Sequence, residues 1–187
     1  NNLTAIAMEK AAAIPPHATV ISGAQDPAVQ AVLEETCRKQ QANLQWVEPL
    51  APACQLGLPG EIQRSNAAVA RGALQALSCV GWTLPEAVIR EGFAAARWPG
   101  RLQTVRWGEH QLRLDGAHNP PAARQLAQER NKWRDESLGV VWILAIQAHK
   151  DAVAMLQALL QPHDQAWILP VPGHKSWCRA ALLQDLP

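Results

Sequence analysis

Leu114-Asp115-Gly116-Ala117-His118-Asn119-Pro120 joins a predicted strand to a predicted helix, and this junction sets the architecture of the second half of the chain. Residues 104–114 are predicted to form two short strands around a Gly-Glu turn. Residues 120–130 are predicted to form a helix, with Asn119 as its N-cap and Pro120 as its first residue. A polar loop at the carboxyl end of a strand, facing a helix N-terminus, is where α/β proteins hold anionic ligands. The alternative is a turn whose Asp115 and Asn119 only cap the helix.

Upstream of this loop, the sequence predicts a block of alternating helices and strands. The expected elements are a helix over 1–13, a strand over 18–23, a helix over 26–41, a strand over 44–47, and helices over 61–80 and 84–97. Asp26 is the expected N-cap of the second helix and Pro27 its first residue. Trp98-Pro99-Gly100 is the expected interdomain hinge, because Pro and Gly in tandem stop a helix and redirect the chain.

Downstream of the hinge, strands and helices alternate, which predicts a small parallel, Rossmann-like domain. The apolar run 140–146 is far too short to span a bilayer and fits a buried parallel strand. Trp142 and Trp167 lie in apolar, strand-like runs and are predicted to be core residues. The predicted fold class is therefore α/β, with a domain boundary between residues 99 and 100.

Composition bounds the class of protein. The chain has 187 residues and is 48% hydrophobic, which is enough for a buried core and for one or two domains. The net charge of +1 gives no electrostatic reason to expect a nucleic acid or an acidic membrane surface as a partner. The four cysteines are scattered without a Cys-x-x-Cys pair, which favours reduced structural thiols over a zinc site.

Several motifs resemble those of the folylpolyglutamate synthase and dihydrofolate synthase family, which is part of the Mur ligase superfamily. In chain order they are Glu9-Lys10-Ala11, Gln63-Arg64-Ser65-Asn66-Ala67-Ala68, Trp98-Pro99-Gly100-Arg101-Leu102-Gln103, Asp-Gly-Ala-His-Asn-Pro at 115–120, and Lys150-Asp151. They occur in the family's order and cover nearly the whole chain. The combination of Asp-Gly-Ala-His-Asn-Pro with Gly-Arg-Leu-Gln is specific to this family. The Gln-x-x-Asn and Lys-Asp motifs would each be weak evidence alone.

The resemblance implies a domain organisation. Residues 1–99 would be the C-terminal part of a P-loop-type Mur ligase central ATPase domain, and residues 100–187 a small parallel-sheet glutamate-ligase domain. The family's phosphate-binding Gly-x-x-x-x-Gly-Lys-Ser/Thr loop and most of its final strands have no counterpart here. We therefore expect a fragment that lacks both ends of the enzyme and is inactive alone.

The activity that the resemblance implies is ATP-dependent, ADP-forming ligation with Mg²⁺. L-glutamate would be added to dihydropteroate or a reduced folate through an acyl phosphate, by a monomeric cytoplasmic enzyme that binds neither nucleic acid nor membrane. Two alternatives stay open. One is a Mur-type ligase for another amino acid; the other is a noncatalytic nucleotide-binding fragment, which the missing phosphate-binding loop favours.

Four residues match family positions at the nucleotide and the metal. Lys10 matches a carbamylated lysine that helps to hold Mg²⁺, since a carbamate offers the metal hard anionic oxygens. Asn66 matches a residue near the adenine, Arg101 one at the phosphates, and Asp115 one at the ribose. The structural alternatives are a surface lysine, a polar residue at a helix start, a hinge salt bridge and a cap.

Two residues match family positions at the incoming glutamate. His118 would position the glutamate amine and is the candidate catalytic base, because a helix N-terminus favours the neutral imidazole. Ser176, after Gly173-His174-Lys175, would also contact glutamate. The alternative for Ser176 is a surface loop.

Overall fold

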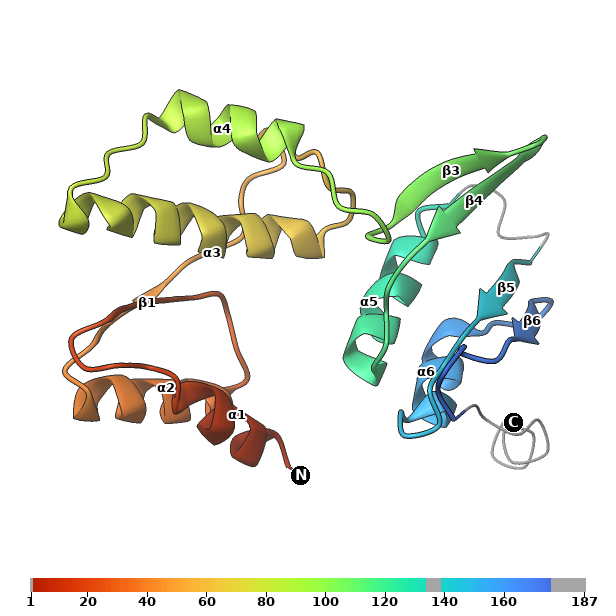
Figure 1. Cartoon of the computed structure of the whole chain (residues 1–187), viewed down its shortest axis with the longest axis horizontal. Helices are drawn as coiled ribbons and strands as arrows, with labels where there is room; N and C mark the ends of the chain where they lie inside the picture. The colour runs from red at the N-terminus through yellow and green to blue at the C-terminus, as the bar shows by residue number, and fades with distance from the viewer. Residues whose placement is uncertain (1, 134–138, 176–187) are drawn as a thin grey trace. The chain divides into compact units, whose positions relative to one another are not determined.

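The computed structural model divides into two compact units, Asn1–Gln103 and Thr104–Pro187. The structure describes residues 2–133 and 139–175. Both units mix helices with short strands (Figure 1). The predicted α/β class is confirmed, and each unit is described below by itself.

The first unit contains one parallel strand pair and its helices. In chain order its elements are α1 (Leu3–Ala11), β1 (Thr19–Ser22), α2 (Pro27–Lys39), β2 (Asn43–Trp46), α3 (Ile62–Ala76), the 3-10 helix η1 (Leu77–Val80) and α4 (Glu86–Ala95). β1 and β2 pair in parallel, with Thr19 opposite Asn43. The Asp26 carboxylate accepts a hydrogen bond from the Ala28 amide at 2.9 Å, which confirms Asp26 as the cap of α2.

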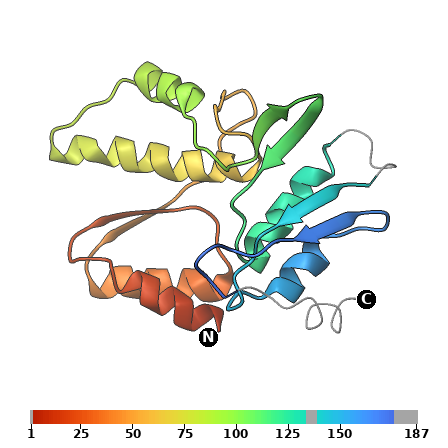
Figure 2. The same cartoon turned by 45° about the vertical axis from the view of Figure 1, so that its right-hand side comes forward.

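The second unit contains a hairpin and a parallel strand pair (Figure 2). In chain order its elements are β3 (Gln103–Trp107, which begins at the last residue of the first unit), β4 (His110–Leu114), α5 (Pro120–Arg130), β5 (Val141–Leu144), α6 (Ala152–Leu159) and β6 (Gln165–Ile168). β5, α6 and β6 form a βαβ unit in which Val141 lies opposite Gln165. β3 and β4 form a sheet of their own, so in the described residues the hairpin does not extend the parallel sheet.

The core of the second unit lies between α5, α6 and one face of β5. Its buried members are Ala123, Trp142, Ile146, Ala152, Met155, Leu156 and Leu159. Trp142 is thus a core residue, as predicted. On the other face, Val141 is 63% and Ile143 is 67% exposed, so the run 140–146 is not the fully buried strand that its composition predicts. Trp167 is 62% exposed, and its prediction as a core residue is wrong, because α5 and α6 pack on the opposite face of the sheet.

A buried ion pair joins the end of α5 to the start of β6. Arg130 and Asp164 meet in a bidentate pair at 2.6 and 2.7 Å, with side chains only 3% and 2% exposed. Asp164 also accepts hydrogen bonds from Trp142 Nε1 and from the Val140 and Gln161 amides. Burial alone raises the pKa of Asp164, but the hydrogen bonds from Arg130, Trp142 and the backbone outweigh it and lower the pKa to about 2.

Gly139, which precedes β5, is closely packed in a left-handed conformation. Its φ is 69°, and a Cβ added there would collide with the carbonyl oxygen of His163. We expect Gly139→Ala to lower the free energy of unfolding by about 2 kcal/mol or more, since a shift of the main chain adds to the backbone strain. Gly108→Ala is the matched control, because φ is 57° there and nothing lies within 4 Å of the added Cβ. Urea unfolding compares the two variants, and equal losses would contradict the packing role of Gly139.

Two features of the described residues bear on the sequence predictions. Within residues 2–133 and 139–175, no helix combines the length and the apolar character needed to cross a bilayer. Cys37, Cys54 and Cys79 are free thiols, as predicted, and Cys178 lies outside the described residues.

Candidate functional site

The loop between β4 and α5 is shaped by its own polar side chains. Asp115 Oδ1 accepts a hydrogen bond from the Ala117 amide at 2.9 Å, which closes a tight Asx turn. Asn119 Oδ1 accepts one from the Ala122 amide at 2.9 Å and caps α5, and Pro120 is the first helical residue. The predicted strand, loop and helix are therefore confirmed, and the loop presents its polar groups at a helix N-terminus, where backbone N–H groups favour anions.

His118 is exposed on this loop with a defined ring orientation. Its Nδ1 lies 2.9 Å from the carbonyl oxygen of Gly116. Because a carbonyl oxygen can only accept, Nδ1 carries the proton, and in the neutral ring Nε2 keeps its lone pair. This tautomer presents an acceptor that suits an ammonium or amine N–H of a ligand.

Arg101 lies in a kinked segment at the end of the first unit. Gly100 has φ of 71° and Leu102 φ of 45°, and the Gly100 amide donates to Gln103 Oε1 at 3.0 Å. Leu102 is 8% exposed, which fixes the segment, whereas the Arg101 side chain reaches solvent. Within the part of the chain that the structure describes, its guanidinium has no hydrogen-bond or ion-pair partner, so it can bind an anion without breaking a contact.

Asn66 lies on α3 beside an apolar pocket of about 230 Å³. Its Nδ2 donates to Gln63 Oε1 at 3.0 Å, and these two amides are the polar side chains of the lining. The other lining residues are Leu56, Leu58, Ala67, Ala70, Phe93 and Ala96. A largely apolar pocket with a few amide groups suits a flat heteroaromatic ring that also forms hydrogen bonds.

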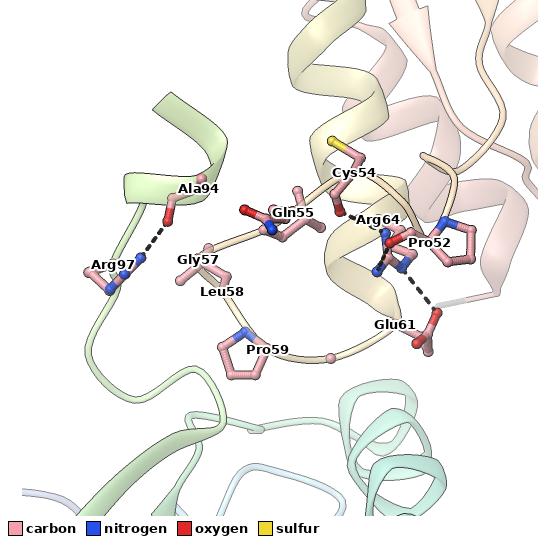
Figure 3. Close-up of a pocket in the computed structure, with 12 residues that line it drawn as sticks. Pro52, Cys54, Gln55, Gly57, Leu58, Pro59, Glu61, Arg64, Ala94 and Arg97 are labelled. Carbon is pink, nitrogen blue, oxygen red and sulfur yellow. Dashed lines mark hydrogen bonds and ion pairs between the residues drawn. The ribbon is translucent and has the colours of Figure 1, made fainter. Parts of the chain in front are cut away.

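A larger and more polar pocket, of about 530 Å³, is also lined by Leu56 and Leu58 (Figure 3). Arg64 fixes the loop over residues 51–54 at this pocket. Its Nη1 donates to the Ala51 and Cys54 carbonyls at 2.8 and 3.2 Å, and its Nη2 donates to the Pro52 carbonyl at 3.3 Å. Sequence reasoning missed this residue. The signal lay in the Gln-x-x-Asn motif itself, since Arg64 is inside it and can reach back to the preceding Pro- and Gly-containing loop.

Gly57 ties the same loop to α4. Its amide donates to the Phe93 carbonyl at 2.8 Å, and a Cβ at this position would collide with Ala96 O and Arg97 Nη1. Arg97 in turn donates to the Ala94 carbonyl at 2.8 Å (Figure 3). The loop whose Leu56 and Leu58 line both pockets is thus held by hydrogen bonds to α3 and to α4.

Lys10 and Ser176 are the least defined of the predicted residues. Lys10 Nζ pairs with Glu9 at 3.1 Å, with 76% of the lysine side chain exposed. Among the described residues, no three His, Cys, Asp or Glu side chains gather where they could hold a metal. A carbamate on Lys10 would supply hard oxygens, but the described residues do not complete a magnesium site around it. Ser176 lies outside the described residues.

The predicted residues therefore fall into two groups. Asp115 and His118 share one short loop of the second unit. Asn66 and Arg101 belong to the first unit, Asn66 at its apolar pocket and Arg101 in its last residues.

Comparisons with known proteins identify relatives along most of the chain. A family model described as "Dihydrofolate synthetase, C-terminal domain" matches residues 101–171. The folylpolyglutamate synthase of Lacticaseibacillus casei is 32% identical over 117 residues, which cover 62% of this chain and 27% of that protein. The dihydrofolate synthetase of Saccharomyces cerevisiae is 30% identical over 191 residues, which cover 88% of this chain and 44% of that protein.

A solved structure extends the similarity to almost every residue. Mycobacterium tuberculosis folylpolyglutamate synthase complexed with ADP superposes with a TM-score of 0.83 at 25% identity, over 99% of this chain and 46% of that one. The chain spans less than half the length of each of these three proteins.

Proposed function

The chain belongs to the folylpolyglutamate synthase and dihydrofolate synthase family, and we propose that it supplies the nucleotide- and glutamate-binding part of an ADP-forming ligase. The observation that carries the proposal is the similarity along 99% of the chain to an enzyme solved with ADP. In this proposal, residues 1–99 end the central ATPase domain and residues 100–187 form the glutamate-ligase domain. The substrates are ATP, L-glutamate, and dihydropteroate or a reduced folate.

The reaction joins a carboxylate to an amine in two steps. The acceptor carboxylate attacks the terminal phosphorus of ATP, which gives an acyl phosphate and releases ADP. The amine of glutamate then attacks the acyl carbon, the bond to the phosphate oxygen breaks, and inorganic phosphate leaves with formation of the amide. Both steps need groups that hold the nucleotide and that orient the amine.

Three residues are assigned to the nucleotide in this proposal. The apolar pocket takes the adenine, and Asn66 provides amide hydrogen bonds to its ring edge. Arg101 binds phosphate oxygens through its exposed guanidinium fork. Asp115 accepts hydrogen bonds from the ribose hydroxyls, a role that suits a carboxylate at the carboxyl end of a strand.

His118 is assigned to the glutamate amine. With Nδ1–H bound to the Gly116 carbonyl, Nε2 can accept the proton that the ammonium loses before its nitrogen attacks. Ser176 is the proposed second glutamate contact. Carbamylated Lys10 stays a proposed magnesium ligand, and no step is assigned to the metal. A monomeric, cytoplasmic enzyme without nucleic-acid or membrane partners is the accompanying prediction.

Nucleotide binding tests the assignment of the apolar pocket. In the complete product of the gene that encodes this chain, we expect Asn66→Ala to raise the Kd of ADP about five- to tenfold, the value of a lost hydrogen bond of about 1 to 1.4 kcal/mol. Isothermal titration calorimetry measures the change. Gln75→Ala, exposed near the other end of α3, is the control and should bind as the wild type does.

Two outcomes would contradict the proposal in different ways. Equal ADP affinity for wild type and Asn66→Ala would show that the adenine does not use this pocket. Absence of ADP binding by the wild type at millimolar concentration would contradict the proposal that this protein binds a nucleotide.

A further inference from the structure

Four side chains of the second unit form a continuous stack in which two aromatic rings lie between two cations. The Arg113 guanidinium carbon lies 4.9 Å from the centroid of the Trp133 ring. The Trp133 and Trp142 ring centroids are 6.1 Å apart, with their planes tilted by 40°. The Arg130 guanidinium carbon lies 5.9 Å from the Trp142 ring centroid. All three separations are within the range in which such pairs attract.

One end of this stack is fixed in the core. Trp142 is 8% exposed, and its Nε1 donates to Asp164 Oδ2 at 2.9 Å. Arg130 is held by the same carboxylate and by the Leu159 carbonyl at 3.0 Å. A ring with a fixed plane and a fixed hydrogen bond is a rigid support for the next ring, Trp133.

The other end of the stack lies next to the candidate site. Arg113 is on β4, two residues before Asp115, and Trp133 follows α5, whose first turn holds the other end of the loop. The Trp133 amide donates to the Arg130 carbonyl at 2.8 Å, so its position is tied to the helix end. The contact between Arg113 and Trp133 therefore joins the two segments that flank the loop from Asp115 to Asn119.

In the described residues, no sheet pairing connects β4 to the parallel strands β5 and β6. Among the described residues, β4 pairs with β3 in a separate two-stranded sheet, and β5 pairs with β6. Hydrogen bonds to the parallel sheet therefore do not set the direction in which β4 leads into the loop. The stack provides a side-chain link from β4 to the anchored core in its place.

We propose that Arg113 and Trp133 are positioning residues, which hold the Asp115–His118 loop in the orientation that its ligands require. The inference rests on the proposed function for the identity of those ligands, nucleotide and glutamate. The restraint itself does not depend on that function, because it follows from the contacts of the described residues. A cation–π contact at a partly exposed site corresponds to a two- to fivefold effect on an equilibrium.

The direct test is hydrogen exchange of the Ala117 amide, which is bonded to Asp115 Oδ1, followed by NMR in the full-length protein. The Val140 amide, which is bonded to Asp164, reports on the core of the same unit. We expect Arg113→Met to speed exchange at Ala117 about threefold or more and to leave Val140 unchanged. Trp133→Leu, which also removes a ring packed against the core, should speed exchange at Ala117 more than at Val140. Arg113→Lys and Trp133→Phe, which keep a cation and an aromatic ring, should stay close to wild type.

Steady-state kinetics provides the second readout. Arg113→Met should raise the KM for ATP and glutamate about threefold with little change in kcat, and Arg113→Lys should restore it. Unchanged exchange at Ala117 in Arg113→Met, or equal acceleration at Ala117 and Val140, would overturn the positioning role. Faster exchange at Ala117 in an enzyme without glutamate-dependent turnover would instead refute the proposed function and leave the restraint of the loop standing.

Discussion

Asp164→Ala is expected to destabilise the second unit by about 3–5 kcal/mol, the usual cost of removing one partner of a buried ion pair. The substitution leaves the Arg130 guanidinium, 3% exposed, without its counter-charge. It also removes the acceptor of the Val140 amide, of Trp142 Nε1 and of the Gln161 amide. Each of these donors would lose a hydrogen bond inside the protein, which adds to the loss.

Denaturant unfolding, followed by tryptophan fluorescence, measures this effect. Glu109→Ala is the matched control, because Glu109 also pairs with an arginine but its side chain is 94% exposed. Surface pairs of this kind contribute about 1 kcal/mol or less. A loss below about 1 kcal/mol for Asp164→Ala would show that the buried pair is not a main support of the unit.

The same carboxylate predicts how stability depends on pH. Its pKa is about 2 in the folded protein against 3.8 for the ordinary value, so the folded state binds the proton more weakly than the unfolded state. The stabilisation is therefore fully present above about pH 4 and is lost as the pH falls toward 2. Acid titration of the wild type should show this loss, and Asp164→Ala should show less of it.

Asp115→Ala and His118→Ala are each expected to lower glutamate-dependent turnover about tenfold or more, which is at least about 1.4 kcal/mol of transition-state stabilisation. Asp115→Ala also removes the acceptor that holds the Ala117 amide, so the loop loses its turn as well as a ligand contact. His118→Ala removes the Nε2 acceptor while the helix cap at Asn119 remains. We therefore expect His118→Ala to act mainly on the glutamate step.

His110→Ala is the control for these two variants, because it removes an exposed histidine from β4 without touching the loop. It should retain wild-type turnover. Full activity in His118→Ala would contradict the assignment of this residue to the amine, and equal losses in all three variants would indicate a general effect on folding.

The features that the sequence predicts correctly depend on neighbours within a few positions. Asp26 and Asn119 each cap the helix that follows them, and the hairpin turns at Gly108, because these interactions are local. The βαβ pattern at 141–168 is also visible in the alternation of apolar runs.

The features that sequence reasoning misses depend on distant segments. Arg130 and Asp164 are 34 positions apart, and nothing in either stretch marks them as a pair. The exposure of Ile143 and Trp167 depends on which face of the sheet the helices cover, which composition does not encode. Within the site, the resemblance indicated Asn66, but the apolar pocket beside it requires Leu56 and Phe93 to meet in space.

The most direct test of the account is ADP release by the complete product of the gene that encodes this chain. The assay supplies ATP and L-glutamate with dihydropteroate in one series and tetrahydrofolate in another, and it omits each component in turn. We predict that ADP release requires both glutamate and at least one of the two acceptors, and the acceptor used identifies the step. No glutamate-dependent release with either acceptor would contradict the account and would favour another Mur-type ligase or a noncatalytic nucleotide-binding protein.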